Sequence, residues 1–458
     1  MISENRSSRR DFLKRTAAGT AVLAAPVVLG TRLFGAGAPS NHLRLAAIGC
    51  GGRSQGVIMK QLAPQADARV VVACDCFADR REKMADQLNA LYGAKVCAPV
   101  ADFREVIARP DIDGVVVCTT DHWHIPIAYA AALAGKDMYV EKPLGPALRW
   151  SLRLREVVQR KKLVFQYGTQ QRGDMAQFRR ACEFVRNGYI GKIKEVLCWC
   201  PDMANEFARA KVQPYGSIEA VAPPAGFDYD RWLGPAPEKP YTVDRCTPFG
   251  GYHIYDYSLG FIAGWGAHPL DIAQWGLNTD DTSPVRYEGT GLLPLRRRLW
   301  DTLESYDVRC DYASGVRLRL TGLRAATPML ERIGIRFHDH GTRFIGDKGW
   351  IQVDRQSLMA SERRLQDAKV EVGENEVRLT RTTSHMRNFL DCMRSRAKPL
   401  APLEAAIRSD TISHLGNAAI RLDRAVRWDP VAERVVGDNE AEVMLDRPRR
   451  AGWDVFTG

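Results

Sequence analysis

A glycine-rich stretch, Gly49-Cys50-Gly51-Gly52-Arg53-Ser54, has the residue types that bind phosphate groups. It lies between a β-prone run at 43–48 and residues 56–63, which can form a helix. Glycines let the chain turn sharply out of a strand and bring its backbone close to a pyrophosphate at a helix N-terminus. Ser54 occupies the third position of the usual fingerprint, where glycine is expected. The stretch predicts a dinucleotide site whose contacts come from Gly49, Gly51, Gly52, Arg53 and Ser54.

An acidic residue, Asp75, follows a second predicted strand at 69–74. A carboxylate at the end of this strand can accept hydrogen bonds from the ribose hydroxyls of an adenosine. The same carboxylate repels the 2′-phosphate that distinguishes NADP from NAD. We therefore predict NAD as the cofactor. NADP is the alternative if Arg53 reaches the ribose and counters Asp75.

Two pairs of histidines have the H-x-H spacing of metal ligands, His122 with His124 and His338 with His340. A zinc site needs three or four protein ligands. No third ligand is visible near either pair in the sequence, so we predict no metal site.

The elements around the glycine stretch alternate between strand and helix. The predicted strands lie at 43–48, 69–74, 113–118, 138–140 and 163–166, and the predicted helices at 56–63, 79–91 and 125–133. Such alternation is typical of a doubly wound parallel sheet, a Rossmann fold when it carries a dinucleotide.

The second half of the chain has a different pattern. Residues 316–320 alternate apolar and charged side chains with period two, which indicates a half-buried strand, and 305–311 can pair with it through a hairpin turn. Further strands are predicted at 193–200, 333–338 and 350–353, and helices at 384–394 and 404–426. We expect an α+β domain here.

Five motifs in this order resemble those of the Gfo/Idh/MocA oxidoreductase family. They are the glycine turn and the runs Thr119–His124 (TTDHWH), Gly135–Pro143 (GKDMYVEKP), Gln166–Arg172 (QYGTQQR) and Gly266–Asp271 (GAHPLD). The resemblance extends from residue 43 to the C-terminus. It implies a nicotinamide cofactor, a sugar or polyol substrate, and a C-terminal domain with an open, mostly antiparallel sheet that mediates homo-oligomerisation. We predict a signal peptide at 1–40, a Rossmann domain at 41–165 and a substrate and oligomerisation domain at 166–458.

Lys142 and His268 are the predicted catalytic residues. Oxidising a carbinol moves a hydride to the nicotinamide while a base takes the hydroxyl proton. Lys142 follows a strand that ends at Val140, at the edge where doubly wound sheets bind substrates. The resemblance implies that His268 shares the substrate hydroxyl with Lys142 and that the Lys142–Pro143 bond is cis. Asp271, one helical turn after His268, is placed to orient its second ring nitrogen.

One position departs from the family pattern. Many members have an aspartate four residues before the histidine, and this chain has Gly264. The run Tyr252-His253-Ile254-Tyr255-Asp256-Tyr257 can supply a substitute hydroxyl or carboxylate, which leaves the replacement open. The resemblance also places Thr119, His124 and Glu141 beside the cofactor. The predicted substrate contacts are Trp123, Tyr167, Gln170, Arg172, Tyr255 and Asp271.

The leading hypothesis is thus an NAD(P)-dependent sugar or polyol oxidoreductase with a tightly bound cofactor. One alternative is a redox-neutral enzyme that oxidises a sugar carbon, eliminates the glycosidic leaving group and then reduces the carbon again. Family members with that chemistry tend to lack the lysine of the E-K-P motif, so Lys142 favours the first hypothesis. The other alternative is a sugar-binding protein without activity, which the Lys142/His268 pair disfavours.

The composition, with 45% hydrophobic and 26% charged residues, is that of a globular protein. Of the formal net charge of +11, the first 40 residues hold six basic and two acidic side chains, so the rest carries +7, with no run of five or six like charges. This distribution gives no support to nucleic-acid binding.

Residues 8–14 (SRRDFLK) match the twin-arginine export motif, and an apolar stretch follows at 17–29. We predict export to the periplasm, with no integral membrane domain after signal removal and a membrane anchor if the signal is not cleaved. Twin-arginine substrates fold before export, in a reducing compartment. The eleven cysteines are therefore predicted to be buried free thiols.

Overall fold

The computed structural model describes residues 42–210, 216–294 and 298–456. The predicted signal at 1–40 lies outside these residues, so it stays a prediction. Within the described ranges, no helix has both the length and the apolar character to cross a membrane.

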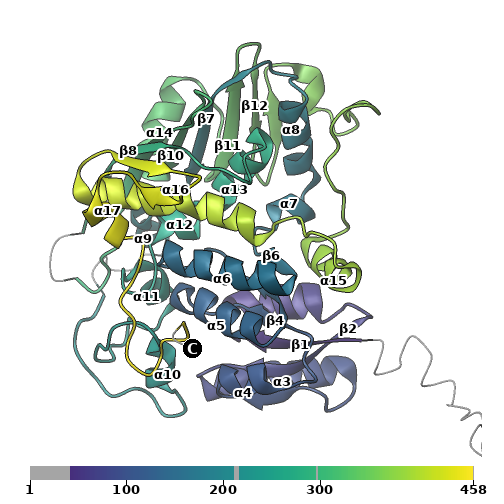
Figure 1. Cartoon of the computed structure of the whole chain (residues 1–458), viewed down its shortest axis with the longest axis vertical. Coiled ribbons are helices and arrows are strands. Elements are labelled where there is room, and N and C mark those ends of the chain that lie inside the picture. The colour runs from purple at the N-terminus through teal and green to yellow at the C-terminus, as the bar shows by residue number, and fades with distance from the viewer. Residues whose placement is uncertain (1–41, 211–215, 295–297, 457–458) are drawn as a thin grey trace, which may run out of the picture. The chain divides into compact units, whose positions relative to one another are not determined.

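The first sheet is parallel and has the strand order β3-β2-β1-β4-β5-β6, which is the order of a dinucleotide-binding fold (Figure 1). Its strands are β1 (Leu43–Ile48), β2 (Ala68–Cys74), β3 (Ala98–Val100), β4 (Gly114–Val117), β5 (Asp137–Val140) and β6 (Phe165–Tyr167). The predicted Rossmann fold is confirmed. The predicted domain boundary between residues 165 and 166 falls inside β6, a strand of this sheet.

This sheet has a hydrophobic core on each face. Successive residues of β1 alternate between the two cores, with Ala46 and Ile48 in one and Leu45 and Ala47 in the other. The helices of this half are α2 (Gly52–Ser54), the π-helix η3 (Gln55–Leu62), α3 (Ala78–Tyr92), α4 (Phe103–Ala108), α5 (Asp121–Leu133) and α6 (Leu148–Lys161). Burial on both faces explains why these strands are nearly continuous apolar runs.

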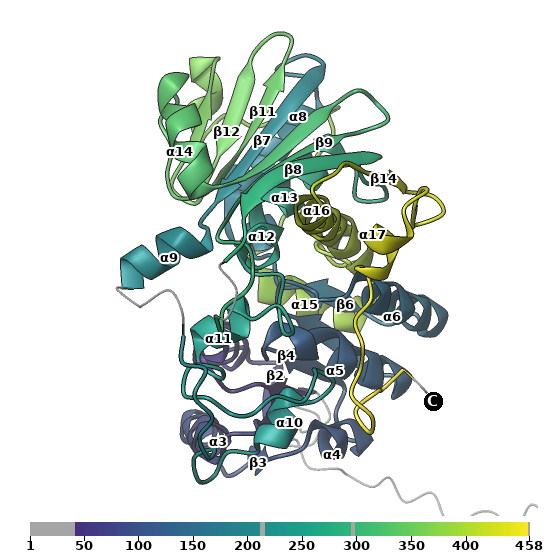
Figure 2. The ribbon, with the colours of Figure 1, turned by 90° about the vertical axis from the view of Figure 1, so that its left-hand side faces the viewer.

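The second sheet has nine strands in the order β13-β12-β11-β7-β10-β9-β8-β14-β15 (Figure 2). They are β7 (Ile193–Cys200), β8 (Arg286–Leu292), β9 (Ser305–Asp311), β10 (Arg317–Gly322), β11 (Gly341–Gly346), β12 (Trp350–Val353), β13 (Leu358–Ala360), β14 (Val426–Asp429) and β15 (Arg434–Val435). Neighbours are antiparallel except β7 and β10. The mostly antiparallel sheet is therefore confirmed too.

The remaining helices pack on the second sheet or connect it to the first. They are α7 (Gln171–Asp174), α8 (Ala176–Arg186), α9 (Met203–Ala210), α10 (Tyr229–Leu233), α11 (Pro248–His253), α12 (Phe261–Gly264), α13 (Ala267–Leu277), α14 (Leu323–Arg332), the 3-10 helix η4 (Arg363–Gln366), α15 (His385–Ser395), α16 (Leu403–Leu422) and α17 (Asn439–Val443). Helix α15 returns to the first sheet, where Met386, Phe389 and Leu390 join the core beside η3.

Two predicted elements are wrong. Residues 333–338 form no strand: the chain leaves α14 there, and Gly334 has a left-handed φ of 65° that breaks an extended run. The helix predicted at 404–426 ends at Leu422, because Asp423 is left-handed and β14 begins at Val426. The cysteine prediction is confirmed, since all eleven are free thiols and most are buried.

Candidate active site at the carboxyl edge of the parallel sheet

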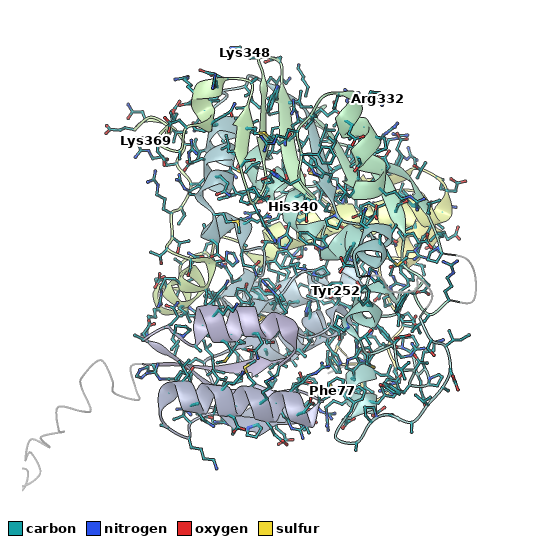
Figure 3. All side chains as sticks on the ribbon, turned by 180° about the vertical axis from the view of Figure 1, so that it is seen from behind. Phe77, Tyr252, Arg332, His340, Lys348 and Lys369 are labelled. Atoms are coloured by element: carbon teal, nitrogen blue, oxygen red, sulfur yellow. The ribbon has the colours of Figure 1, made fainter. Side chains whose placement is uncertain are left out.

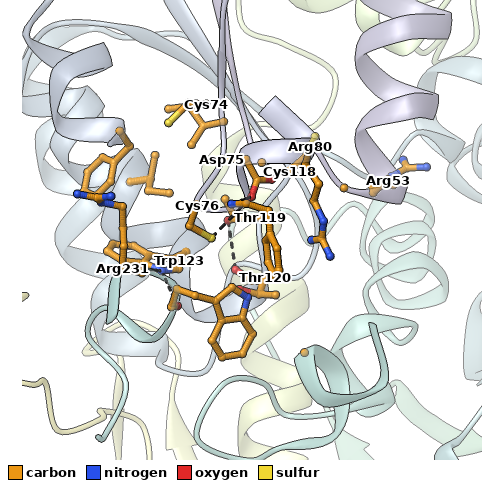
Figure 4. Close-up of a pocket in the computed structure, with 18 of the residues that line it drawn as sticks. Arg53, Cys74, Asp75, Cys76, Arg80, Cys118, Thr119, Thr120, Trp123 and Arg231 are labelled. Atoms are coloured by element: carbon orange, nitrogen blue, oxygen red, sulfur yellow. Dashed lines mark hydrogen bonds between the residues drawn. The ribbon is translucent and has the colours of Figure 1, made fainter. Parts of the chain in front are cut away.

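Two adjoining cavities lie where the parallel strands end. The first has a volume of about 280 Å³ and is lined by the glycine turn, the residues after β2 and the loop before α5 (Figure 4). The second has a volume of about 310 Å³ and contains both predicted catalytic residues. Arg53, Pro248 and Tyr252 line both cavities, so a ligand in one can meet a ligand in the other.

The glycine turn has the geometry that a dinucleotide requires. Gly49 has a φ of 88°, and a Cβ at this position would lie 2.5 Å from the backbone oxygen of Cys118. A Cβ on Gly52 would meet nothing within 4 Å, so this side of the turn is open to a ligand. The hydroxyl of Ser54 donates to the backbone oxygen of Gly49 and holds the turn. A pyrophosphate at the start of α2 and η3 fits this cradle.

Asp75 lines the first cavity next to the glycine turn. Its carboxylate accepts hydrogen bonds from the backbone N–H groups of Cys50 at 2.7 Å and Phe77 at 2.9 Å. Burial nevertheless raises the pKa of Asp75 above its usual range. In Figure 4, Arg80 is the cation beside Asp75, whereas the guanidinium of Arg53 points away from them. Arg53 is bound to the Glu141 carboxylate at 2.8 Å, so Arg80 and not Arg53 is placed to meet a 2′-phosphate.

The segment after β2 is covered by a distant part of the chain. The rings of Phe77 and Phe227 stack with centroids 3.8 Å apart. Backbone hydrogen bonds join Ala78 to Gly226 and Asp228 to Cys76 on either side of this stack. Residues 226–228 thus support Cys76 and Phe77, which line the first cavity.

Lys142 lines the second cavity, and the Lys142–Pro143 peptide bond is cis, as predicted. Its Nζ donates to the backbone oxygen of Gly264 at 2.8 Å and to the Tyr252 hydroxyl at 3.4 Å. These two contacts occupy two hydrogen-bonding directions of the tetrahedral Nζ, and a third direction is left for a substrate hydroxyl.

Tyr252 occupies the space beside the atypical Gly264. A Cβ on Gly264 would lie 3.0 Å from the Tyr252 ring, so an aspartate at this position would collide with it. Figure 3 shows Tyr252 between Phe77 at the first sheet and His340 at the second. Of the open candidates in the 252–257 run, the structure therefore brings the Tyr252 hydroxyl to Lys142.

His268 is buried on α13 and lines the second cavity. Burial lowers its pKa well below the usual range, and the charges of Lys142 and Arg355 lower it further. The imidazole is therefore neutral at neutral pH. Its Nδ1 is buried and has no hydrogen-bond partner among the described residues.

The prediction that Asp271 orients His268 is wrong. Asp271 instead binds the Arg172 guanidinium through both oxygens, at 2.8 and 2.7 Å, and Asp280 completes this ion pair. Arg172 and Asp271 are fully buried and line neither cavity. The predicted substrate contacts of Arg172 and Asp271 are therefore not supported, because the two side chains form a buried ion pair with each other.

Other predicted residues separate into three groups. Gln170 lines the second cavity, and its amide donates to Glu141 at 2.9 Å. Trp123 and Thr119 line the first cavity, so Trp123 lies on the cofactor side and not at the substrate. The third group, His124, Glu141, Tyr167 and Tyr255, lines neither cavity.

The residues of this third group contact the chain around the two cavities and do not face a ligand. The Nδ1 of His124 donates to the backbone oxygen of Pro143 at 2.6 Å, and Glu141 accepts from Arg53. Tyr167 is fully buried and donates to Asp410 at 2.9 Å. Tyr255 is stacked between Arg421 and Arg447, whose guanidinium carbons lie 3.6 and 3.8 Å from its ring centroid. The predicted substrate contacts of Tyr167 and Tyr255 are therefore not supported.

Sequence reasoning missed most of the second cavity. Its remaining lining residues are Glu206, Pro248, Phe249, His253, Phe261, Trp265 and Arg355. They come from α9, α11, α12, the residue after α12 and the turn between β12 and β13, and no single motif contains them. Within the described ranges, no group of three or more His, Cys, Asp or Glu side chains is arranged to hold a metal ion.

Two family models match the chain. Residues 43–169 match an oxidoreductase-family model described as an NAD-binding Rossmann fold, and residues 212–328 and 338–455 match the C-terminal alpha/beta domain of the same family.

Similar proteins include both dehydrogenases and glycosidases. "Glycosyl hydrolase family 109 protein 2" of Shewanella sp. (strain ANA-3) is 31% identical over 163 residues, which cover 31% of this chain and 36% of that protein. The myo-inositol 2-dehydrogenase of Thermotoga maritima is 30% identical over 150 residues, covering 33% and 42%. The matched stretch thus spans less than half of either relative.

Solved structures share the fold over a longer range. The aldose-aldose oxidoreductase of Caulobacter crescentus, crystallised with glycerol, has a TM-score of 0.57 and 16% sequence identity, and the match covers 84% of this chain and 99% of that one. At this identity the similarity concerns the fold alone.

Proposed function

The chain belongs to the Gfo/Idh/MocA family of oxidoreductases, and from this premise we propose that it transfers a hydride between a sugar or polyol carbinol and a bound nicotinamide cofactor. The observation that carries the proposal is the pair of adjoining cavities. One has a dinucleotide cradle, the other holds Lys142 and His268, and Tyr252 forms part of both walls.

The first cavity fits a dinucleotide by its own residues. Gly49, Gly51 and Gly52 would hold the pyrophosphate and Asp75 the adenosine ribose. When bound, the nicotinamide supplies the hydride acceptor or donor. Asp75 supports a preference for NAD, whereas Arg80 beside it supports some tolerance of NADP. Titration of cofactor-free protein with each dinucleotide decides the preference.

Lys142 acts as the proton acceptor in this proposal. With Nζ–H bonds directed at Gly264 and Tyr252, the remaining position on the nitrogen receives the substrate hydroxyl proton. His268, held neutral by burial and by the cations around it, serves as a hydrogen-bond partner for the same hydroxyl. The aromatic rings of Phe249, Phe261 and Trp265 provide the apolar wall against which a sugar ring packs.

A redox-neutral glycosidase is the second candidate, because several similar proteins are named glycosyl hydrolase family 109. That reaction would also use the cofactor, but without net reduction. The presence of Lys142 favours the dehydrogenase. Release of a glycosidic leaving group from a nitrophenyl glycoside, without accumulation of reduced cofactor, would favour the glycosidase.

We further propose that the protein is exported with its cofactor already bound. The twin-arginine motif at residues 8–14 supports this proposal, as do the hydrogen bonds by which residues 226–228 hold the segment beside Asp75. No soluble NAD pool is expected outside the cytoplasmic membrane, so turnover there requires a retained cofactor that is reoxidised in place.

The test begins with mass analysis of the ligand released by denaturing freshly purified protein. Desalted protein is then assayed with sugars and polyols, singly and in pairs, with no cofactor added. The proposal predicts a released nicotinamide dinucleotide and sugar-dependent reduction of it. Protein that neither contains nor binds a dinucleotide would overturn it.

A further inference from the structure

Arg355 is a cation of the second cavity that the proposed reaction does not use. It lies on the turn between β12 and β13 and lines the cavity together with Lys142 and His268. Its guanidinium carbon lies 5.2 Å from the centroid of Trp265, another wall residue. Stacking on an indole ring fixes the plane of a guanidinium and leaves its edges free for hydrogen bonding.

The guanidinium of Arg355 has no carboxylate partner among the described residues. Its Nε is buried without a hydrogen-bond acceptor. Asp339, whose charge acts on Arg355, instead accepts a hydrogen bond from His340 at 2.8 Å. An unpaired guanidinium in a half-buried position is costly unless a ligand completes it.

The turn that presents Arg355 is rigid. Asp354 is fully buried, and its Oδ1 accepts from the backbone N–H groups of Gln356 and Ser357, both at 2.8 Å. Its Oδ2 bonds His338 at 2.8 Å, and Gln177 donates to the backbone oxygen of Arg355 at 3.0 Å. The guanidinium is therefore preorganised, which lowers the entropic cost of binding.

Binding of the cofactor does not explain why a cation is present at Arg355. The first cavity, where the pyrophosphate fits, is lined by Arg53, Arg80 and Arg231 and not by Arg355. Of the other two cations in the second cavity, Arg53 is neutralised by Glu141 and Lys142 faces Gly264 and Tyr252. Arg355 is the cation in this cavity that remains for a substrate.

We propose that the natural substrate is a sugar acid whose carboxylate binds Arg355, a uronate or aldonate and not a neutral sugar. This rests on the proposed function and narrows its substrate class. A planar guanidinium pairs with a carboxylate through two parallel hydrogen bonds, and the cavity has about the volume that one monosaccharide needs. The aromatic wall then holds the ring while its hydroxyl faces Lys142 and His268.

Calorimetric titration of cofactor-loaded protein tests this with pairs that differ only in the acid group. The probes are glucuronate and glucose, galacturonate and galactose, and gluconate and glucitol. The best acid should bind at least about tenfold more tightly than its neutral partner, as expected for one charge-assisted pair. Neutral sugars that bind as well as the acids, or no binding by any acid, would overturn the proposal. Tighter binding of glucose 6-phosphate than of every acid would also contradict the carboxylate assignment.

Two variants make the assignment specific. R355Q should lose the preference for acids, so that each acid binds no more tightly than its neutral partner. R355K, which keeps the charge but not the planar fork, should weaken acid binding several-fold and keeps the test valid if R355Q does not fold. The matched control is R343Q: Arg343 also stacks on an indole, 3.7 Å from the centroid of Trp350, and also has a buried unpartnered Nε, but it lines neither cavity. If the preference for acids persists in R355Q, or is lost in R343Q, Arg355 is not the residue that binds the carboxylate.

The outcome is separable from that of the proposed function. Acids that bind through Arg355 but never reduce the cofactor would refute the dehydrogenase and leave the anion site standing. If neutral sugars reduce the cofactor and Arg355 makes no contribution, the dehydrogenase proposal stands and the anion site is refuted.

Discussion

The proton chemistry of this site depends on three atoms: Lys142 Nζ, the Tyr252 hydroxyl oxygen and the backbone oxygen of Gly264. Where a family aspartate would stand, Gly264 offers only its carbonyl, and the Tyr252 ring fills the vacated space. A neutral hydroxyl thus takes the place of a carboxylate beside the lysine.

K142A should lower turnover by about 10²–10⁴-fold, the usual contribution of a positioned acid–base group. The affinity for the dinucleotide should stay near that of the wild type, because the glycine turn is untouched. Steady-state kinetics together with dinucleotide titration measure both quantities. Near wild-type turnover would remove Lys142 from the mechanism, and K95A, at an exposed lysine, is the control.

Y252F keeps the ring that lines both cavities and removes only the hydroxyl. We expect kcat to fall by about 3- to 10-fold, because a single hydrogen bond contributes about 0.5–1.5 kcal/mol. The matched control is Y255F, whose hydroxyl accepts from Asn417 at 3.1 Å outside both cavities. Equal effects of the two substitutions would show that Tyr252 has no special part in proton transfer.

Among the elements, helix α16 is joined through Asp410 to residue Leu144, which follows Lys142 and Pro143 in the chain. Its carboxylate accepts from the backbone N–H of Leu144 at 2.8 Å and from the Tyr167 hydroxyl at 2.9 Å. Burial raises its pKa to about 7. The folded state therefore binds this proton more tightly than the unfolded state, whose carboxyl has the ordinary value of 3.8.

Because the folded-state pKa is raised, the contribution of Asp410 to stability is lost as the pH rises from about 4 to about 7. D410N has no such proton to lose. Its stability relative to the wild type should improve by about 2–3 kcal/mol between about pH 5 and about pH 8. Denaturant unfolding at the two pH values measures this difference. D86N, at an exposed carboxylate, should show no such trend, and a pH-independent D410N effect would contradict the assignment.

The elements that could be predicted from sequence are those whose pattern is local. Strands β1, β7, β9 and β12 have the predicted bounds, because apolar or alternating runs end at clear turn residues. Residues 333–338 also alternate, yet Gly334 turns the chain and the sheet takes 341–346 instead. The alternation of apolar and polar residues does not by itself determine which of two such segments becomes a strand of the sheet.

The same reasoning applies to the site. The positions of Lys142 and His268 follow from motifs, and both line one cavity, although their roles stay predictions. Tyr252 meets Lys142 across 110 residues of chain, and Arg355 arrives on a hairpin of the second sheet. Such contacts depend on the tertiary arrangement of elements that are far apart in the sequence, so they cannot be predicted from the spacing of residues within a motif.

At the scale of the whole molecule, export and cofactor retention should be coupled. Replacement of Arg9 and Arg10 by lysine should abolish appearance of the protein in the periplasmic fraction while leaving folded, dinucleotide-loaded protein in the cytoplasm. Cell fractionation with mass analysis of the released ligand measures both. Export that is unaffected by the substitutions would refute the twin-arginine route.

The proposed function requires a bound nicotinamide and Lys142 to act on one substrate where the two cavities adjoin. A single-turnover measurement tests it most directly: desalted protein in its oxidised form is mixed with excess sugar or sugar acid, and the near-ultraviolet absorbance of reduced nicotinamide is followed. We expect up to one equivalent of reduced cofactor per active site in the wild type, and formation of it at least about a hundredfold more slowly in K142A. Reduction at equal rates in the two proteins, or none in the wild type with any substrate despite bound cofactor, would contradict it.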